Sequence, residues 1–215
     1  MAERWDRWGP LTGIAMVVLF LGAGVLTGNE PKPSASGATV IAFYGAHKGR
    51  LEVGGYLLGL AVVTGMFFYG YLREHIRVQE GSPRLAAISF GGVVIFALSG
   101  LVGAGTSLAL AEAPGTLAPA AAQALNLMQN FLVAYAFNVG AAVLLIASGL
   151  AIVRGHSLPR WVGWLALVLA LLAFVPLPNA GVPAVGVWTL VVGIVLLVRT
   201  RRADIMPAAR TQVTV

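Results

Sequence analysis

The sequence predicts an all-α, polytopic integral membrane protein that crosses the bilayer six times. Of its 215 residues, 58% are hydrophobic and only 10% are charged, whereas a soluble domain carries about 25% charged residues. Six stretches are apolar over roughly the 20 residues that a helix needs to cross the hydrocarbon. Because lipid offers no hydrogen-bond partners to the backbone, segments of this kind are expected to be helices.

The six predicted helices form a single bundle over residues 1–199. Serine and proline at Ser82-Pro83 and at Ser157-Leu158-Pro159 mark the starts of the third and fifth helices, because serine caps a helix and proline suits its first turn. A basic, disordered cytoplasmic tail is expected over residues 200–215. The predicted spans are residues 10–27, 51–71, 85–110, 131–153, 158–177 and 182–198.

The first 28 residues have two interpretations. Arginines followed by the apolar run 14–26 are typical of a cleaved signal peptide. Trp5 and Trp8 instead suit an anchor at the membrane interface, where amphipathic rings are enriched. We favour a retained first helix, and either outcome leaves the sidedness of the other five unchanged.

Basic residues predict the orientation of the bundle. Of the 14 Lys and Arg residues, only Lys32, Lys48 and Arg50 fall in loops on one side. Cytoplasmic loops carry the excess of basic residues, so both termini are predicted to be cytoplasmic, in a bacterial plasma membrane. The other side is expected to hold Arg4, Arg7, Arg73, Arg77, Arg84, Arg154, Arg160, Arg199, Arg201, Arg202 and Arg210.

The first outer loop, residues 28–50, is predicted to contain a short amphipathic surface helix. Val40, Phe43, Tyr44 and His47 recur at the spacing of one helical face. Such a helix suits either a lid or partner surface, or a loop that packs its apolar face on the bundle. We favour packing on the bundle.

A stripe of amides supplies the candidate ligand site. Gln123, Asn126, Asn130 and Asn138 follow at helical spacing on the fourth predicted span. Amides in lipid must face protein or water, so they either join neighbouring helices or line a cavity for a small polar or amphipathic ligand. We favour the interhelical role. Glu52, the one carboxylate at the edge of a predicted span, completes the candidate set.

Other chemistry has little support in the sequence. There is no cysteine, and the three histidines fall at helix ends or loops, so no metal, haem or other cofactor is expected. No phosphate-binding loop or hydrolase motif is present, so an enzyme is not expected. The basic tail lacks the folded module of a nucleic-acid-binding protein.

Small residues predict close helix packing. Gly24 and Gly28, and likewise Gly55 and Gly59, are spaced as in motifs that let helices approach closely. Membrane lipids are the expected partners, together with other membrane subunits or further copies of this chain.

Three stretches carry a resemblance to a known family. They are Ile41-Ala42-Phe43-Tyr44-Gly45-Ala46-His47, Tyr71-Leu72-Arg73, and Leu158-Pro159-Arg160-Trp161-Val162-Gly163-Trp164. With the loop lengths, they resemble a family of small six-helix bacterial membrane proteins, common in actinobacteria, that forms a domain of unknown function. The resemblance implies the six-helix architecture and supplies no catalytic residues.

Two functions are therefore open. The first is a non-enzymatic accessory or scaffold subunit that works through helix and loop contacts. The alternative is a binding or permeation protein for a lipid or small uncharged molecule, which would use the polar stripe of the fourth helix.

Overall fold

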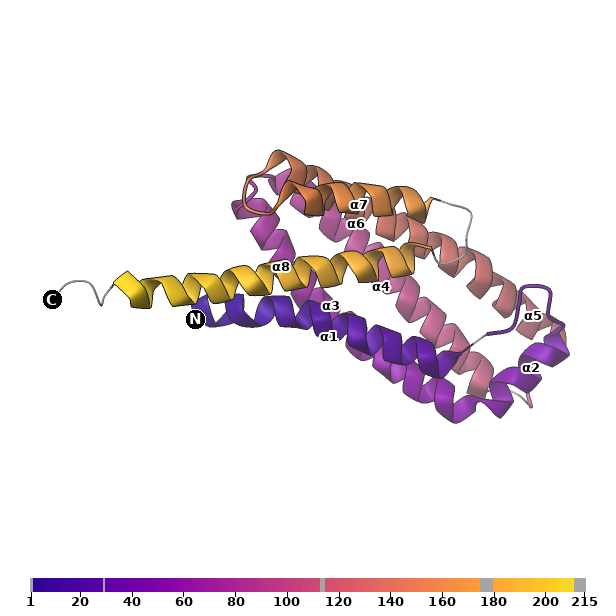
Figure 1. Ribbon diagram of the computed structural model, residues 1–215. Coiled ribbons are helices and arrows are strands. Elements are labelled where there is room, and N and C mark those ends of the chain that lie inside the picture. The colour runs from indigo at the N-terminus through magenta and orange to yellow at the C-terminus, as the bar shows by residue number, and fades with distance from the viewer. Residues whose placement is uncertain (1, 29, 113–114, 175–179, 211–215) are drawn as a thin grey trace.

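The computed structural model describes residues 2–28, 30–112, 115–174 and 180–210, and within these ranges all regular structure is helical (Figure 1). Five helices there are long and apolar enough to cross a membrane: Trp8–Thr27, Lys48–Val78, Pro83–Glu112, Pro119–Arg154 and Gly181–Thr200. The elements are α1 (Ala2–Thr27), α2 (Gly37–Ala46), α3 (Lys48–Val78), α4 (Pro83–Glu112), α5 (Pro119–Met128), the π-helix η1 (Gln129–Val133), α6 (Ala134–Arg154), α7 (Arg160–Ala173) and α8 (Gly181–Arg210).

The long helices pack as a ring. α1 packs along α3, α3 on α4, α4 on α6, and α6 on α7, while α8 contacts both α7 and α1 and so closes the ring. Figure 1 shows α2 and α5 together at one end of the bundle, and the two chain ends at the other. We call the first the capped end and the second the basic end. The name refers to Arg84, Arg154 and Arg160, which lie at helix termini there, and to Arg199, which lies at the end of the candidate span of α8.

Hydropathy predicted most of the long helices but not all of their limits. The fourth predicted span belongs to one continuous helix, Pro119–Arg154, which a π-turn interrupts. The fifth was expected over residues 158–177, yet α7 has 14 residues, or about 21 Å at 1.5 Å per residue. It is therefore shorter than the five candidate spans, so this predicted span is not among the helices long enough to cross a membrane. Residues 175–179 lie outside the described ranges. α8 continues past the predicted end at Val198 to Arg210, and residues 211–215 of the expected tail also lie outside them.

Two glycines allow α4 and α6 to cross backbone to backbone. A Cβ added at Gly140 would lie 2.6 Å from the backbone nitrogen of Phe96, and one at Gly92 would collide with the backbone of Leu144. Any side chain would separate the helices at this point. The predicted Gly24 and Gly59 contribute no such contact, because a Cβ at either would meet nothing within 4 Å.

The half of the ring toward the basic end is filled by side chains. Trp188, Phe68 and Leu72 are fully buried there. Two buried hydroxyl pairs tie helices across this core: Tyr69 Oη and Thr189 Oγ1 are 2.6 Å apart, and Ser89 and Ser148 Oγ atoms are 2.7 Å apart. These contacts hold α3 to α8 and α4 to α6.

α2 and α5 cover the capped end of the bundle. Ser36 Oγ accepts a hydrogen bond from the backbone nitrogen of Thr39 and so caps α2. Val40 and Tyr44 of α2 are 0% exposed and pack with Leu110 of α4 and Ala122 of α5. α2 is thus a short helix within residues 28–50, and its buried residues pack on the bundle. That it is an amphipathic helix on the membrane surface stays a prediction.

Candidate functional site

A cavity of about 260 Å³ lies inside the ring beneath the capped end. Residues from α1, α3, α4, η1, α6 and α8 line it, so each long helix on this side contributes to its wall. Most of the wall is apolar, with Phe20, Leu58 and Phe137 as its largest side chains. The polar side chains on this wall are those of Thr27, Glu30, Ser107, Gln129 and Asn130, and three of them form a network at Glu30.

Glu30 lies in the segment that connects α1 to α2. Its Oε2 accepts a hydrogen bond of 2.6 Å from Gln129 Nε2, and its Oε1 accepts one of 3.2 Å from Ser107 Oγ. Gln129 Nε2 also lies 2.9 Å from Ser107 Oγ, which closes a three-residue network. The network joins the segment between α1 and α2 to α4 and η1, and all three of its residues line the cavity.

No basic side chain balances this carboxylate. Among the ion pairs within the described ranges, none involves Glu30, and Arg50 instead donates to the backbone oxygen of Leu26. Burial raises the pKa of Glu30 above its usual value, and the hydrogen bonds from Ser107 and Gln129 offset only part of that rise. The protonated form is therefore favoured over a wider pH range than for a carboxyl in water.

Two polar atoms beside Glu30 lack a hydrogen-bond partner. Tyr44 is fully buried, and its hydroxyl lies near Ser107 and Gln129 without forming a well-aligned hydrogen bond to either. Burial raises the pKa of Tyr44, and the negative charge of Glu30 raises it further. The Oε1 atom of Gln129 is also buried and unpartnered. Such atoms are costly to bury in a folded protein, and they commonly mark a place where water, an ion or a ligand binds.

The amides at the start of the fourth predicted span hold the segment that carries Glu30. Asn126 is buried, and its Nδ2 donates to the backbone oxygen of Lys32 at 3.0 Å. Asn130 Nδ2 donates to the backbone oxygens of Asn126 at 2.8 Å and of Pro31 at 3.4 Å. These bonds fix the residues just after Glu30 and so position its carboxylate over the cavity.

The structure thus separates the sequence-predicted site residues. Asn130 lines the cavity. Asn126 does not line it, but its hydrogen bond to the backbone oxygen of Lys32 holds the segment that carries Glu30. Asn138 lies deeper, where its Oδ1 accepts a hydrogen bond of 2.8 Å from the backbone nitrogen of Gly181 at the start of α8. Gln123 is exposed at the capped end, and Glu52 faces Lys48 at 3.8 Å on the surface.

Sequence reasoning missed Glu30, Gln129 and Tyr44 as members of one polar site. Glu30 lies outside every predicted span, in the first outer loop and before its predicted short helix. Gln129 lies off the stripe of amides on a regular helix, but the π-turn that starts at this residue reorients the side chains around it. A carboxylate followed by proline in an outer loop with few charges was the only available signal.

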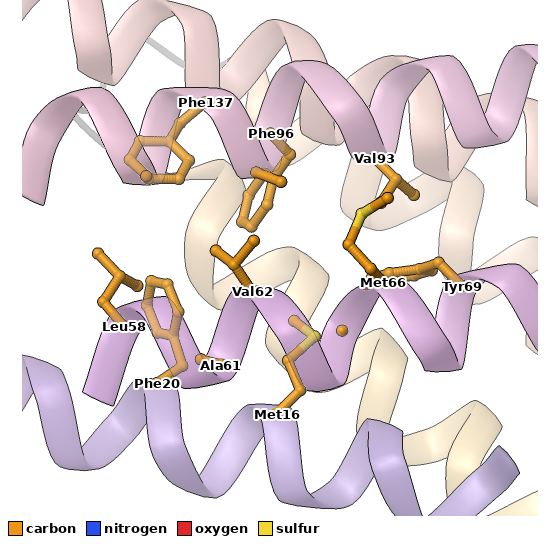
Figure 2. Close-up of a pocket in the computed structure, with 13 residues that line it drawn as sticks. Met16, Phe20, Leu58, Ala61, Val62, Met66, Tyr69, Val93, Phe96 and Phe137 are labelled. Carbon is orange, nitrogen blue, oxygen red and sulfur yellow. The ribbon is translucent and has the colours of Figure 1, made fainter. Parts of the chain in front are cut away.

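Apolar space continues from the cavity toward the bundle surface. A constriction of about 30 Å³ adjoins it, where Met16 and Phe20 of α1 face Phe96 and Phe137 (Figure 2). A second apolar space of about 240 Å³ follows between α1 and α8. Phe20 lines all three spaces, so this side chain lies at their junction.

A second polar cluster lies at the basic end. Glu80 is buried, and its carboxylate accepts hydrogen bonds from the backbone nitrogens of Ser157 and Leu158 and from Ser157 Oγ. His75 Nε2 lies 2.8 Å from the same Ser157 Oγ. Every oxygen of Glu80 is therefore engaged in holding the chain just before α7. The described residues contain no group of three or more His, Asp or Glu placed to hold a metal ion.

Fold and cavity together define a helical bundle with several helices apolar enough for a membrane, enclosing a space with one polar end. Comparison of the chain with protein-family models, with curated proteins and with solved structures finds no match. The resemblance to the actinobacterial six-helix family therefore stays a prediction.

Proposed function

We propose that the protein is a non-enzymatic, membrane-embedded binding protein for a small amphipathic molecule. The single observation that carries this proposal is the cavity of about 260 Å³, whose wall is apolar except for the cluster at Glu30. Ligand sites in proteins are typically concave and apolar, with a few polar groups that orient the ligand. At this volume, the cavity suits a molecule smaller than a typical drug.

The proposal places the protein in a bacterial plasma membrane with both termini in the cytoplasm. The five long apolar helices support a membrane location, and the arginines at the basic end support its cytoplasmic orientation. The capped end, with Glu30, then faces the outside. Single cysteines at Ser34 and Thr116 should react with an impermeant thiol reagent from outside, whereas cysteines at Ser82 and His156 should not. Reaction of His156→Cys from outside would reverse this orientation.

We also propose that the chain passes the bilayer a sixth time through α7. α7 begins beside Glu80 at the basic end, and α8 begins beside Asn138, well along α6 toward the capped end. The chain between them therefore traverses much of the depth of the bundle. A cysteine at Ala180 should be labelled from outside if the α7–α8 connection reaches that surface. Protection of Ala180→Cys from both sides would instead indicate a re-entrant hairpin.

Filling the cavity tests the binding proposal. Ala104 lines the cavity, so Ala104→Phe should occupy the space where a ligand would bind. Gly105 is the matched control, because it is exposed and a Cβ there would meet nothing within 4 Å. Protein purified from native membranes should retain a small amphipathic molecule in native mass spectra of the wild type and of Gly105→Phe. Ala104→Phe should lose it, and equal retention by all three proteins would contradict the proposal.

The accessory or scaffold role expected from the sequence is tested in the same preparations. A partner subunit that remains bound through purification from native membranes would support it. Recovery of this chain alone, with a small molecule in its cavity, would favour the binding role.

A further inference from the structure

The charge balance of the cavity indicates what kind of molecule fits it. Glu30 is a partly buried carboxylate that receives hydrogen bonds only from uncharged groups, Ser107 and Gln129. A charge taken out of water normally requires a paired countercharge or is neutralised by protonation. Within the described ranges no basic side chain pairs with Glu30. The part of the chain that the structure describes therefore supplies no countercharge for Glu30.

The unpartnered atoms beside Glu30 indicate the hydrogen-bonding character of the missing group. Gln129 Oε1 and Tyr44 Oη are both buried without a partner, and both can accept hydrogen bonds. Glu30, Ser107 and Gln129 line the polar end of the cavity, whereas Tyr44 is not among its lining residues, so the acceptors on this part of the wall belong to the Glu30 network. An anionic head group would face repulsion from Glu30. A neutral head group would leave the Glu30 carboxylate without a countercharge.

We propose that this site takes an amphipathic organic ammonium ion, with the protonated amine against Glu30 and its neighbours Ser107 and Gln129, and the apolar substituent toward Leu58 and Phe137. A primary ammonium carries one positive charge and three N–H donors, which matches the missing charge and the acceptor-rich surroundings. Below the polar cluster the wall is apolar, so a bare inorganic cation would leave most of the cavity unfilled. The inference rests on the proposed binding function and narrows its ligand class from small amphipathic molecules in general to cationic ones, in place of the uncharged molecule expected from the sequence.

Binding of such an ion should lower the pKa of Glu30. In the empty site Glu30 holds its proton more tightly than a carboxyl in water does, because burial disfavours the charged form. A bound R–NH₃⁺ favours the carboxylate opposite it, so binding releases to solvent the H⁺ that the carboxyl still holds at the pH of the experiment. The other titratable group that faces this carboxyl is Tyr44 of α2, whose pKa burial raises, so it stays neutral. Arg50 of α3 is directed to Leu26 instead.

The test compares two probes of equal chain length, hexylamine and hexanol, on the full-length protein in detergent at pH 7.5. The wild type should bind hexylamine about tenfold or more tightly than hexanol, which is the scale of one charge-assisted hydrogen bond. Glu30→Gln keeps the shape of the side chain and should lose this preference while hexanol binding remains. Glu74→Gln is the control, because Glu74 is an exposed carboxylate that pairs with Arg77 near the basic end of α3. This variant should change neither affinity.

Proton release gives a second measurement. Calorimetric titration of hexylamine in two buffers of different ionisation enthalpy should show a buffer-dependent heat in the wild type and none in Glu30→Gln. Equal affinities for hexylamine and hexanol that Glu30→Gln leaves unchanged would overturn the ammonium proposal while the binding function stands. Failure of both probes to bind the wild type would overturn the two together. Glu30-dependent binding of Na⁺ or K⁺ without any of hexylamine would also overturn the ammonium proposal.

Discussion

Gln129 Nε2 donates a 2.6 Å hydrogen bond to Glu30 Oε2, across 99 positions of sequence. This bond joins the π-turn of the fourth spanning helix to the segment between α1 and α2. π-turns within α-helices are rare and occur frequently at functional sites. Here the turn begins at the residue that meets the carboxylate, so the irregular helix and the polar end of the cavity are one structural feature.

The raised pKa of Glu30 predicts how stability changes with pH. In the unfolded chain this carboxyl loses its proton near pH 4.3, whereas in the folded protein it does so at higher pH. The folded state therefore binds the proton more tightly, and this contribution to stability is complete below about pH 4. It is lost as the pH rises through the folded pKa. Without ligand, the wild type should have a melting temperature that falls over this range.

Glu30→Gln isolates that contribution. The variant should melt at nearly the temperature of the wild type at pH 4 and above it at pH 8, because glutamine stays neutral at both. Scanning fluorimetry in detergent measures the difference, with Glu74→Gln as an exposed carboxylate control. A wild type that melts higher than Glu30→Gln at pH 8 would show that Glu30 is stable as a carboxylate.

Asn138 is expected to tolerate aspartate better than leucine. Its Oδ1 accepts from the backbone nitrogen of Gly181, the first residue of α8. Aspartate retains this acceptor, and negative charge is favourable at a helix N-terminus. A charged side chain at the centre of a membrane helix costs about 2.5–3.5 kcal/mol. The hydrogen bond from Gly181 should reduce this cost for aspartate at position 138.

The measurement is reversible unfolding of the two variants. Asn138→Leu removes the acceptor and should lower the free energy of unfolding by about 0.5–2 kcal/mol, as loss of a helix cap does. Asn138→Asp should lie closer to the wild type. The reverse order, with aspartate the more damaging, would indicate that the Asn138–Gly181 bond does not control this position.

The crossing of α4 and α6 should be sensitive to a single methyl group. A Cβ at Gly140 would lie 2.6 Å from the nitrogen of Phe96, so Gly140→Ala should force the helices apart and cost about 1–3 kcal/mol. Gly91→Ala is the control, since nothing lies within 4 Å of a Cβ there. It should be neutral or stabilising by up to about 1 kcal/mol. Equal melting temperatures for both variants would contradict the close crossing.

Glu80 should act as a clamp on the start of α7. Its carboxylate accepts from the backbone nitrogens of both Ser157 and Leu158, and Gly155 has no side chain because a Cβ there would collide with Glu80. Glu80→Ala should destabilise the protein by about 1–3 kcal/mol, because buried donors lose their acceptor. Glu80→Gln retains one acceptor oxygen and should cost less. Protease sensitivity near His156 should rise in the same order.

The sequence was informative about helices because hydropathy is a local property. The long apolar runs predicted α1, α3, α4 and most of α6 and α8, and the spacing of Val40 and Tyr44 predicted the packed face of α2. The length of α7 was overestimated because an apolar run does not show at which residue the helix ends. The Gly92–Gly140 crossing could not be distinguished from other glycine pairs, since close approach depends on which helices are neighbours.

The candidate site was less predictable because it depends on contacts between distant segments. The amides Asn126 and Asn130 were found from their helical spacing, and both lie at the site. Glu30 has no periodic pattern around it, so its placement over the cavity emerges only when the connecting segment folds onto η1. Regular helical spacing also predicts no π-turn, so Gln129 was not identified.

Phe20 should control passage between the cavity and the membrane side of the bundle. Its side chain lines the polar-ended cavity, the constriction at Met16 and the apolar space between α1 and α8. An amphipathic ligand that first partitions into lipid would pass this side chain to reach Glu30. Phe20→Trp should therefore slow association and dissociation of hexylamine together and leave its equilibrium affinity almost unchanged. Phe20→Ala should speed both rates, although loss of a partly buried ring will also lower stability.

Stopped-flow measurement of both rates tests this, with Leu21→Ala as a control because Leu21 borders the outer apolar space and does not line the other two. Unchanged rates in Phe20→Trp would show that ligand reaches Glu30 by another route, such as directly from the capped end.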